Sequence, residues 1–479
     1  MGSITANNTS PMSRRLLYRL VGMLIAFPMA LSAQTYKLDI QVRDMGQDTC
    51  ILAYHFGDKQ YIKDTVYSDA RGRMSYTTEE PLKEGLYYLV LPNRNFLEFI
   101  TDQKTLNLST SYDDVIQDMD PGDSKENQIF YGFLKYSELR GQKAADLRTM
   151  IKTAEDEKEE KKLRKDLQKI NEEIQEYKKG VIEDHPRSFV ATFFEASREP
   201  ELPEPKKLAN GKVDSTYPYR WYRQHYLDNV DFSDERLLRT PILHNRMMRY
   251  LDKIVMRHPD TLIEAVKMIT ARASGNDEVY KYVVHKLTSK YERSKYMGMD
   301  AVFVHLVENH YANGRADWVS EENMTKIVQR ARQIKPTLLG KVAPQIQLKD
   351  TEGQARRLHN VSADYTVVYI WDPDCGHCKK ATPKLKKIYD KYDRETLEVF
   401  AVNNALEKEK WLKFIDKHNL NWINVADFEM EGSYRAYYDV RSTPMVFLLD
   451  ENKEILAKKI SVEQLDDLLE RMTSQKSKS

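Results

Sequence analysis

The sequence predicts a multidomain protein with a β-sandwich-like N-terminal domain, an all-α middle domain and an α/β C-terminal domain. At 479 residues the chain is longer than a single core normally serves. Its apolar periodicity is that of strands up to about residue 112 and that of helices from about residue 125, and strand and helix patterns alternate from about residue 337. We therefore expect domains at 34–115, 116–336 and 337–475, preceded by a signal at 1–33 and followed by a tail at 476–479.

The first 33 residues have the organisation of a secretory signal. Arg14, Arg15 and Arg19 precede an apolar run at 20–27, and small residues follow up to Ala33. A cationic segment, a short apolar segment and small residues at a cleavage site are typical of exported chains. A retained membrane anchor is the alternative, although the run is short for crossing ~30 Å of hydrocarbon. We expect export, no stable membrane span after cleavage, and a periplasmic location in a double-membrane bacterium.

The charge balance and the number of cysteines exclude some classes of function. Lysine plus arginine (74) balance aspartate plus glutamate (73), so there is no net field to attract nucleic acid. The three cysteines, Cys50, Cys375 and Cys378, are too few for a disulfide-stapled scaffold. Cys50 lies in a strand-like run and is expected to be a small buried hydrophobic residue, with a redox or intermolecular role as the alternative.

The region from about 35 to 112 reads as short strands separated by turns. Apolar and polar residues alternate from Tyr36 to Val42, as a half-buried strand requires. Further β-prone runs lie at 50–54, 86–91, 96–100 and 106–108. A small β-sandwich is the expected product.

The middle region is helical and highly charged. Apolar residues spaced alternately by four and three form a seam on one long helix: Leu163, Leu167, Ile170, Ile174, Tyr177 and Val181. The seam is expected to pack against a neighbouring helix of the same domain, with dimerisation as the alternative, and the oligomeric state is left open. The histidines here do not have metal-ligand spacing, and neither a metal nor an organic cofactor is expected.

The C-terminal region alternates strands and helices. A continuous β-prone run at 365–371 is expected to be a central strand covered on both faces. Further strands are predicted at 397–402 and 445–449, and a closing amphipathic helix at 462–469. This alternation is typical of an α/β domain.

The C-x-x-C motif directly follows the central strand. Pro373 ends the strand, and a helix is expected to begin near Cys375. Unpaired N–H groups and the dipole at a helix N-terminus stabilise a thiolate, so Cys375 is the expected nucleophile. Cys378 lies three residues further on the same helical face and would resolve the mixed disulfide. A structural disulfide gains little from closing so small a loop, which favours redox chemistry.

Neighbouring charges act on this thiolate with opposite signs. His377, if protonated, would stabilise it, whereas Asp372 and Asp374 would oppose it. A zinc site would need four ligands, and one C-x-x-C supplies two. A chance spacing of two buried cysteines remains the other alternative.

The C-terminal domain resembles the TlpA/ResA-like branch of the thioredoxin superfamily. The matching segments are an N-terminal hairpin at 340–353, the strand ending at Trp371, the Cys375–Gly376–His377–Cys378 motif, Pro383, and Arg441–Ser442–Thr443–Pro444. The resemblance implies a thioredoxin-like thiol–disulfide oxidoreductase in which Cys375 and Cys378 form the redox-active disulfide. It also implies that Trp371, Asp374, His377 and Pro383 modulate the pair, and that Thr443 and a cis Pro444 present backbone to an extended substrate segment.

The whole chain is similar to multidomain oxidoreductases of the Bacteroidetes type, with a DUF4369-like β-domain and a DUF5106-like helical domain upstream. Protein thiols or disulfides and an upstream redox partner are the implied partners. The chain departs from the family at two acidic positions. Tyr369 replaces the buried aspartate of thioredoxins, and Ala381 replaces the glutamate of many TlpA/ResA-like proteins. Water or a carboxylate elsewhere would then have to deprotonate Cys378.

Two other functions compete with this expectation. A peroxiredoxin-type thiol peroxidase would need threonine or serine three residues before the reactive cysteine, where this chain has Asp372. A non-catalytic binding protein would use the thioredoxin-like domain only as a docking module.

Overall fold

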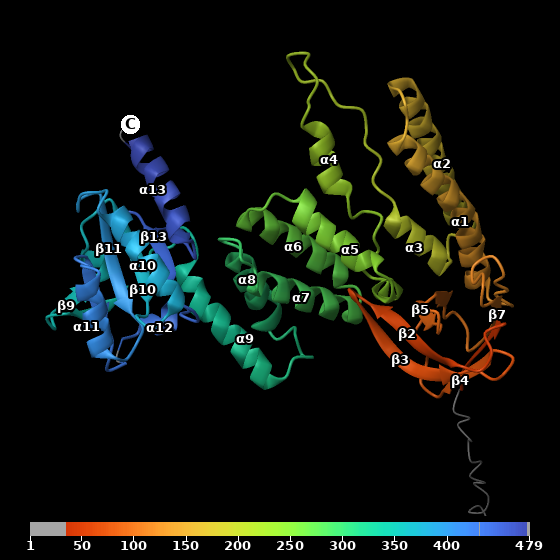
Figure 1. Cartoon of the computed structure of the whole chain (residues 1–479), viewed down its shortest axis with the longest axis horizontal. Helices are drawn as coiled ribbons and strands as arrows, with labels where there is room; N and C mark the ends of the chain where they lie inside the picture. Colours follow the sequence, from red (N-terminus) through yellow and green to blue (C-terminus); the bar gives the residue numbers. More distant parts are fainter. Residues whose placement is uncertain (1–34, 431, 477–479) are drawn as a thin grey trace, which may run out of the picture.

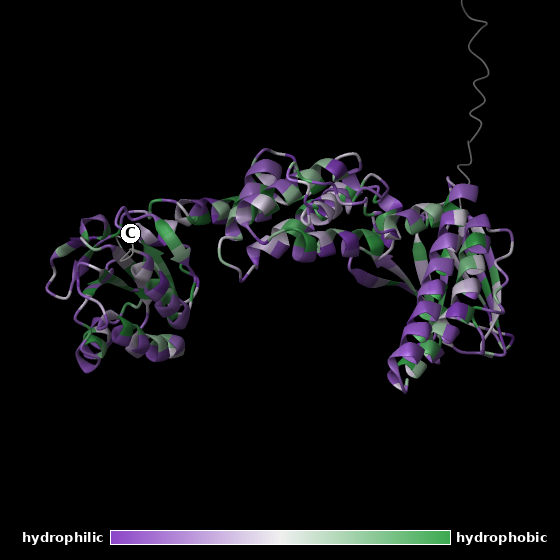
Figure 2. Ribbon diagram, turned by 90° about the horizontal axis from the view of Figure 1, so that it is seen from above, coloured by the Kyte–Doolittle hydropathy of each residue, from purple (hydrophilic) through white to green (hydrophobic). Residues whose placement is uncertain are grey.

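The computed structural model describes residues 35–430 and 432–476. The predicted signal at 1–33 lies outside the described residues, as do the last residues of the predicted tail. The molecule is elongated, with the two N-terminal sheets and the first two helices at one end, further helices in the middle and an α/β domain at the other end (Figure 1). Seen from above, these parts again lie in a row (Figure 2). Within the described ranges, no helix is both long enough and apolar enough to cross a bilayer.

Two sheets form the N-terminal part. One has the order β4-β1-β7 and the other β3-β2-β5-β6. The strand bounds are β1 Tyr36–Arg43, β2 Thr49–Phe56, β3 Lys59–Tyr67, β4 Arg73–Thr78, β5 Leu86–Val90, β6 Phe96–Ile100 and β7 Thr105–Ser111. Leu38 and Ile40 of β1 and Leu52 and Leu89 of the second sheet are buried in one apolar cluster, because alternate side chains of each strand point inward.

The first two helices of the middle region form a hairpin that carries the predicted seam. They are α1 Lys125–Lys152 and α2 Glu157–Asp184. Leu163 and Ile170 of α2 pack with Ala144 and Leu147 of α1, so the seam is buried within the chain. Ser124 and Asp156 cap the two helices by accepting backbone hydrogen bonds, which satisfies N–H groups that have no intrahelical partner.

Shorter helices follow the hairpin. The α-helices are α3 Phe189–Ser197, α4 Tyr217–His225, α5 Ile242–Arg249, α6 Pro259–Ala273, α7 Asp277–Glu292, α8 Asp300–Leu306 and α9 Glu321–Ile334. The short 3-10 and π segments are η1 Glu235–Arg239, η2 Tyr250–Ile254, η3 Val307–Tyr311 and η4 Lys335–Thr337.

The sheets and the helices share one continuous core. Their buried apolar side chains belong to a single cluster that extends from Leu38 to Ile334. Asn127 of α1 is fully buried and bonds both backbone groups of Ile100 in β6, at 2.9 and 2.7 Å. These contacts anchor the helical hairpin to the second sheet, since an unpaired buried amide would cost free energy.

The C-terminal domain contains a seven-stranded sheet of order β14-β13-β10-β11-β12-β8-β9. Its strands are β8 Gln347–Asp350, β9 Ala355–Arg357, β10 Tyr365–Trp371, β11 Leu397–Asn403, β12 Ile423–Ala426, β13 Met445–Leu449 and β14 Ile455–Lys458. Its helices are α10 Gly376–Tyr389, α11 Lys408–Lys417, α12 Tyr434–Tyr437 and α13 Val462–Lys476, with the 3-10 segment η5 Leu358–Asn360. β10 pairs in parallel with β11 and antiparallel with β13.

Both faces of β10 are covered. Tyr369 and Trp371 join an apolar cluster with residues of α10, α11 and α13, while Val368 and Ile370 join a second cluster on the side of α12. Every residue of β10 is buried, as the continuous apolar run predicted. The predicted fold class, with β-sandwich-like, all-α and α/β parts, is confirmed.

Helix α9 connects the middle region to the C-terminal domain. Arg330 on α9 contacts Glu292 at the end of α7 at 2.9 Å and Asp439 after α12 at 3.1 Å. A second polar contact joins Lys458 of β14 to Asp300 of α8 at 2.5 Å, and the lysine also donates to the Thr337 carbonyl. Charged groups thus bridge the two regions.

Candidate active site

Cys375 caps helix α10 at the carboxyl edge of the central strand. Its backbone is extended, and its Sγ accepts a hydrogen bond from the Cys378 N–H at 3.4 Å. The sulfur also lies 3.2 Å from the carbonyl oxygen of Thr443. Both cysteines are present as thiols; Cys375 is partly exposed, whereas Cys378 is fully buried. The first sulfur is therefore the one that a polypeptide can reach.

The two thiols differ in acidity. Partial burial of Cys375 opposes its ionisation, but hydrogen bonds from Thr443, Cys378 and the His377 backbone outweigh this and lower its pKa. Burial raises the pKa of Cys378 to about 12, and the neighbouring Cys375 sulfur adds to this effect. A nucleophile that ionises easily thus lies beside a second thiol that keeps its proton.

The two acidic residues before the motif, Asp372 and Asp374, already form polar contacts of their own. Asp374 lies 2.8 Å from Lys410 and 3.9 Å from Lys379, and its hydrogen bond with Lys410 lowers the pKa of its carboxyl group. Asp372 accepts the backbone N–H of Asp374 at 2.7 Å. The predicted repulsion between Asp374 and the thiolate is consequently reduced by two cations. His377 is exposed on the first turn of α10.

Aromatic side chains fill the space beneath the motif. Trp371 is fully buried and stacks with Tyr369 at 6.2 Å between ring centroids. Tyr369, at the position of the thioredoxin aspartate, bonds the Thr382 hydroxyl at 2.8 Å, and burial raises its pKa. Its hydroxyl therefore stays protonated near neutral pH. Ala381 is half-buried and has no ionisable group.

The remaining predicted site residues come from α10 and from the loop before β13. Pro383 lies inside α10. The peptide bond between Thr443 and Pro444 is cis, and this loop reaches Cys375 through the Thr443 carbonyl. Trp371 and Asp374 thus belong to the segment that leads into Cys375, whereas the fold brings Thr443 and Pro444 to the cysteines from a segment 68 positions further along the chain.

A groove of about 580 Å³ lies beside the motif. Its walls include His377, Pro444 and, from the middle region, Arg330. Sequence reasoning missed Arg330 and its partner Asp439. They are 109 positions apart in the chain, and local spacing does not reveal such a contact.

Other candidate features lie away from this site. Cys50 is fully buried in β2, and burial raises its pKa to about 11, as expected for a small hydrophobic residue. Groups of histidine, cysteine and acidic residues that could hold a metal are absent from the residues with described positions.

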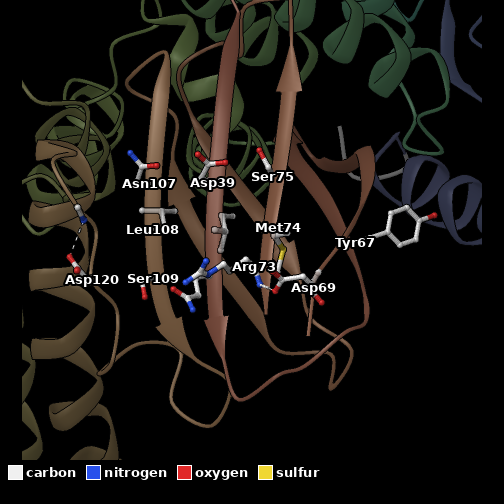
Figure 3. A pocket seen from close by; sticks show the side chains of 14 residues that line it. Asp39, Tyr67, Asp69, Arg73, Met74, Ser75, Asn107, Leu108, Ser109 and Asp120 are labelled. Carbon is white, nitrogen blue, oxygen red and sulfur yellow. Dashed lines mark hydrogen bonds between the residues drawn. The ribbon is translucent and has the colours of Figure 1, made fainter. Parts of the chain in front are cut away.

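A cavity of about 670 Å³ lies on the β4-β1-β7 sheet, where Asp39 lies opposite Ser75 and Asn107 (Figure 3). It is at the other end of the molecule from Cys375. This cavity is therefore no part of the cysteine site.

Two protein-family models match the chain. Residues 339–458 match the AhpC/TSA family, and residues 155–335 match a domain of unknown function, DUF5106. The first covers the α/β domain with its cysteines, and the second covers most of the helical region. These matches agree with the resemblance drawn from the sequence.

Curated relatives share the C-terminal domain. The thiol-disulfide oxidoreductase ResA of Geobacillus thermodenitrificans is 27% identical over 135 residues, which is 28% of this chain and 76% of that protein. ResA of Bacillus cereus is 28% identical over 140 residues, 28% of this chain and 79% of that protein.

Solved structures are also similar. A domain of a possible thiol-disulfide isomerase from Cytophaga hutchinsonii is 39% identical, covering 30% of this chain and 99% of that one, with a TM-score of 0.28. A thioredoxin-like protein from Bacteroides caccae is 21% identical, covering 57% of this chain and 98% of that one, with a TM-score of 0.46.

Proposed function

The chain is a TlpA/ResA-like multidomain thiol–disulfide oxidoreductase, and from this premise we propose that Cys375 and Cys378 exchange disulfides with protein substrates outside the cytoplasm. The observation that carries the proposal is the position of the partly exposed Cys375 sulfur at the N-terminus of α10, 3.4 Å from the N–H of the buried Cys378. The lowered pKa of Cys375 and the raised pKa of Cys378 support it. The signal-like segment at 1–33 supports export.

The exchange proceeds in two balanced steps. The Cys375 thiolate attacks one sulfur of a substrate disulfide, and the other substrate sulfur leaves as a thiolate. Cys378 then gives its proton to solvent and attacks the Cys375 sulfur, which releases the second substrate thiolate and forms the Cys375–Cys378 disulfide. Two electrons have passed to the substrate. A dithiol partner restores the reduced pair by the same steps, and the reverse order oxidises a substrate dithiol.

The Thr443–Pro444 loop supports a polypeptide substrate. Its backbone lies against the attacking sulfur, so an extended segment could pair with it while presenting its own sulfur to Cys375. The open groove beside this loop offers room for side chains of such a segment.

Trapping with Cys378→Ala tests the proposal. Without the second thiol, a mixed disulfide on Cys375 should accumulate in the native compartment and be released by dithiothreitol. The double variant Cys375→Ala/Cys378→Ala is the matched control and should yield no adduct, whereas Cys50→Ala should exchange normally. The absence of any reducible adduct, together with no turnover of insulin disulfides, would rule the proposal out.

Thiol peroxidase activity is a second candidate, favoured by the match to the AhpC/TSA family. Asp372 argues against it, because a carboxylate already bonded to backbone stands where a hydroxyl would help to bind peroxide. Peroxide consumption by the reduced protein distinguishes the two activities. If Cys375→Ala cells keep the wild-type phenotype and the protein exchanges no disulfide, the domain acts only in docking.

A further inference from the structure

The groove beside the cysteine motif is built by three segments of the C-terminal domain and one helix of the middle region. The start of α10, the loop before β13 and the turn between β14 and α13 form its walls, and α9 contributes Arg330. Pro444, Val446, Ile460 and Val462 supply apolar surface. A volume of about 580 Å³ is in the range of ordinary ligand sites. The lining includes Pro444, whose peptide bond with Thr443 is cis.

Cations predominate among the residues that line this groove. Five are lysine or arginine, and two are acidic: Arg330, Lys380, Lys384, Arg441, Lys459, Asp439 and Glu463. The exposed His377 also faces it. A concave surface lined by one sign of charge raises the local concentration of segments with the opposite charge.

Both acidic residues form ion pairs with cations of the groove wall. Asp439 is buried and contacts Arg330 and Arg441 at 3.1 Å each, with Lys459 at 4.0 Å. Its single charge is therefore shared among three cations. Glu463 contacts Lys384 at 2.5 Å.

The cations on the wall other than Arg330 are exposed to solvent. The side chain of Arg441 is 60% exposed and that of Lys459 is 46% exposed, while Lys380 is exposed on the second turn of α10. Arg330, by contrast, is held between Glu292 and Asp439 and is only 13% exposed. It fixes Asp439, two residues before Arg441, and so acts as a positioning residue supplied by the middle region.

We propose that this groove binds an acidic stretch next to the reacting cysteine of the substrate, so that the protein exchanges disulfides preferentially in segments rich in aspartate and glutamate. The inference rests on the proposed exchange at Cys375. Complementary charge at such a site speeds encounter and fixes the register of the segment, and it does so most strongly at low salt.

Two disulfide-containing peptides test the inference. They share the same neutral sequence around the disulfide, but glutamates flank it in one peptide and lysines flank it in the other. With the full chain in reduced form and in single turnover, the second-order rate constant for reduction of the peptide disulfide should favour the acidic peptide by about tenfold at low salt, since several exposed ion pairs contribute together. Raising the NaCl concentration should reduce this ratio towards one, because salt screens exposed charges. A ratio near one at low salt, or a preference for lysine, would overturn the inference.

Charge reversal at the groove locates the effect. Lys380→Glu should lower the acidic-to-basic ratio several-fold, and Lys380→Glu/Arg441→Glu should lower it further or invert it. Lys387→Glu is the matched control: it makes the same change in charge on the same helix, but Lys387 is exposed and does not line the groove. Equal effects of Lys387→Glu and Lys380→Glu would assign the preference to overall charge and contradict a specific groove.

A neutral small disulfide, that of mercaptoethanol, separates this inference from the proposed function. If the wild-type chain exchanges it and reacts equally with both peptides, the groove proposal fails and the exchange stands. If the chain exchanges neither this disulfide nor the peptides, the exchange itself fails.

Discussion

The hydroxyl groups of Tyr369 and Thr382 lie 2.8 Å apart in the buried layer beneath the two cysteines. This neutral pair takes the place where thioredoxins carry a buried acid. The pKa of the Cys378 thiol is set by its burial, by the Asp372 backbone and by the side chains of Cys375 and Thr443. Its deprotonation must then depend on the proton concentration of the solvent.

The resolving step should therefore be strongly pH-dependent. The pKa of Cys378 is raised to about 12, so its thiolate fraction increases about tenfold for each unit of pH in the neutral range. Release of a fluorescent peptide from a preformed Cys375 mixed disulfide, followed by stopped flow, should accelerate accordingly. A rate that is flat between about pH 6 and pH 9 would show that a protein base acts on Cys378.

Alkylation should distinguish the two thiols of the reduced protein. The pKa of Cys375 is lowered, so its reaction with iodoacetamide should have a midpoint below that of an ordinary thiol. Below that midpoint the rate falls as pH falls, because the thiolate is the reactive form. Peptide mass mapping should find Cys378 and Cys50 unmodified in the folded chain. A Cys375 midpoint at or above the ordinary value would contradict the hydrogen-bonded thiolate.

Tyr369→Phe should destabilise the C-terminal domain by about 1–2 kcal/mol, because it leaves the buried Thr382 hydroxyl without its partner. Urea unfolding followed by tryptophan fluorescence measures the change. Tyr437→Phe, at a residue that is 42% exposed, is the matched control and should have almost no effect. Equal effects at both positions would mean that the buried pair contributes no stability.

The ion pair between Lys458 and Asp300 should be sensitive to removal of one partner. The lysine side chain is only 2% exposed, so Lys458→Met should cost about 3–5 kcal/mol by leaving Asp300 charged and largely buried. Lys458→Met/Asp300→Leu should recover most of that loss. Thermal unfolding of the wild type, the two single variants Lys458→Met and Asp300→Leu, and the double variant measures the coupling energy between the two residues.

Lys413→Met is the control for that cycle. It removes a lysine whose side chain is 81% exposed, and it should change stability by less than about 0.5 kcal/mol. A cost at Lys458 as small as that at Lys413 would show that the buried pair does not join the two regions.

The fold could be read from the sequence wherever burial imposes a period. β10 is buried on both faces and gave a continuous apolar run, and the seam of α2 gave the helical spacing. β3 was not predicted, because it is an edge strand whose side chains are mostly exposed and therefore show no apolar alternation. β4, the next strand along the chain, belongs to the other sheet and was not predicted either, because it is short and has one buried side chain, Met74.

Local spacing could likewise predict the chemistry of the cysteine motif but not its surroundings. The strand, Pro373 and the two cysteines lie in sequence order, so their geometry followed from a strand that ends and a helix that begins. The groove depends on α9, the loop near Asp439 and the turn before α13, which only the tertiary fold brings together. The cluster of positive charge on the groove wall could therefore not be predicted from any single segment of the sequence.

The shared core of the sandwich and the helices means that three sequence-defined parts make two cooperative units. Residues from Leu38 to Ile334 should melt together, since removing either the sheets or the helices would strip the other of its apolar contacts. The α/β domain has its own two clusters and should melt separately. Calorimetry should accordingly resolve two transitions, and a truncation between the sandwich and the hairpin should yield insoluble fragments.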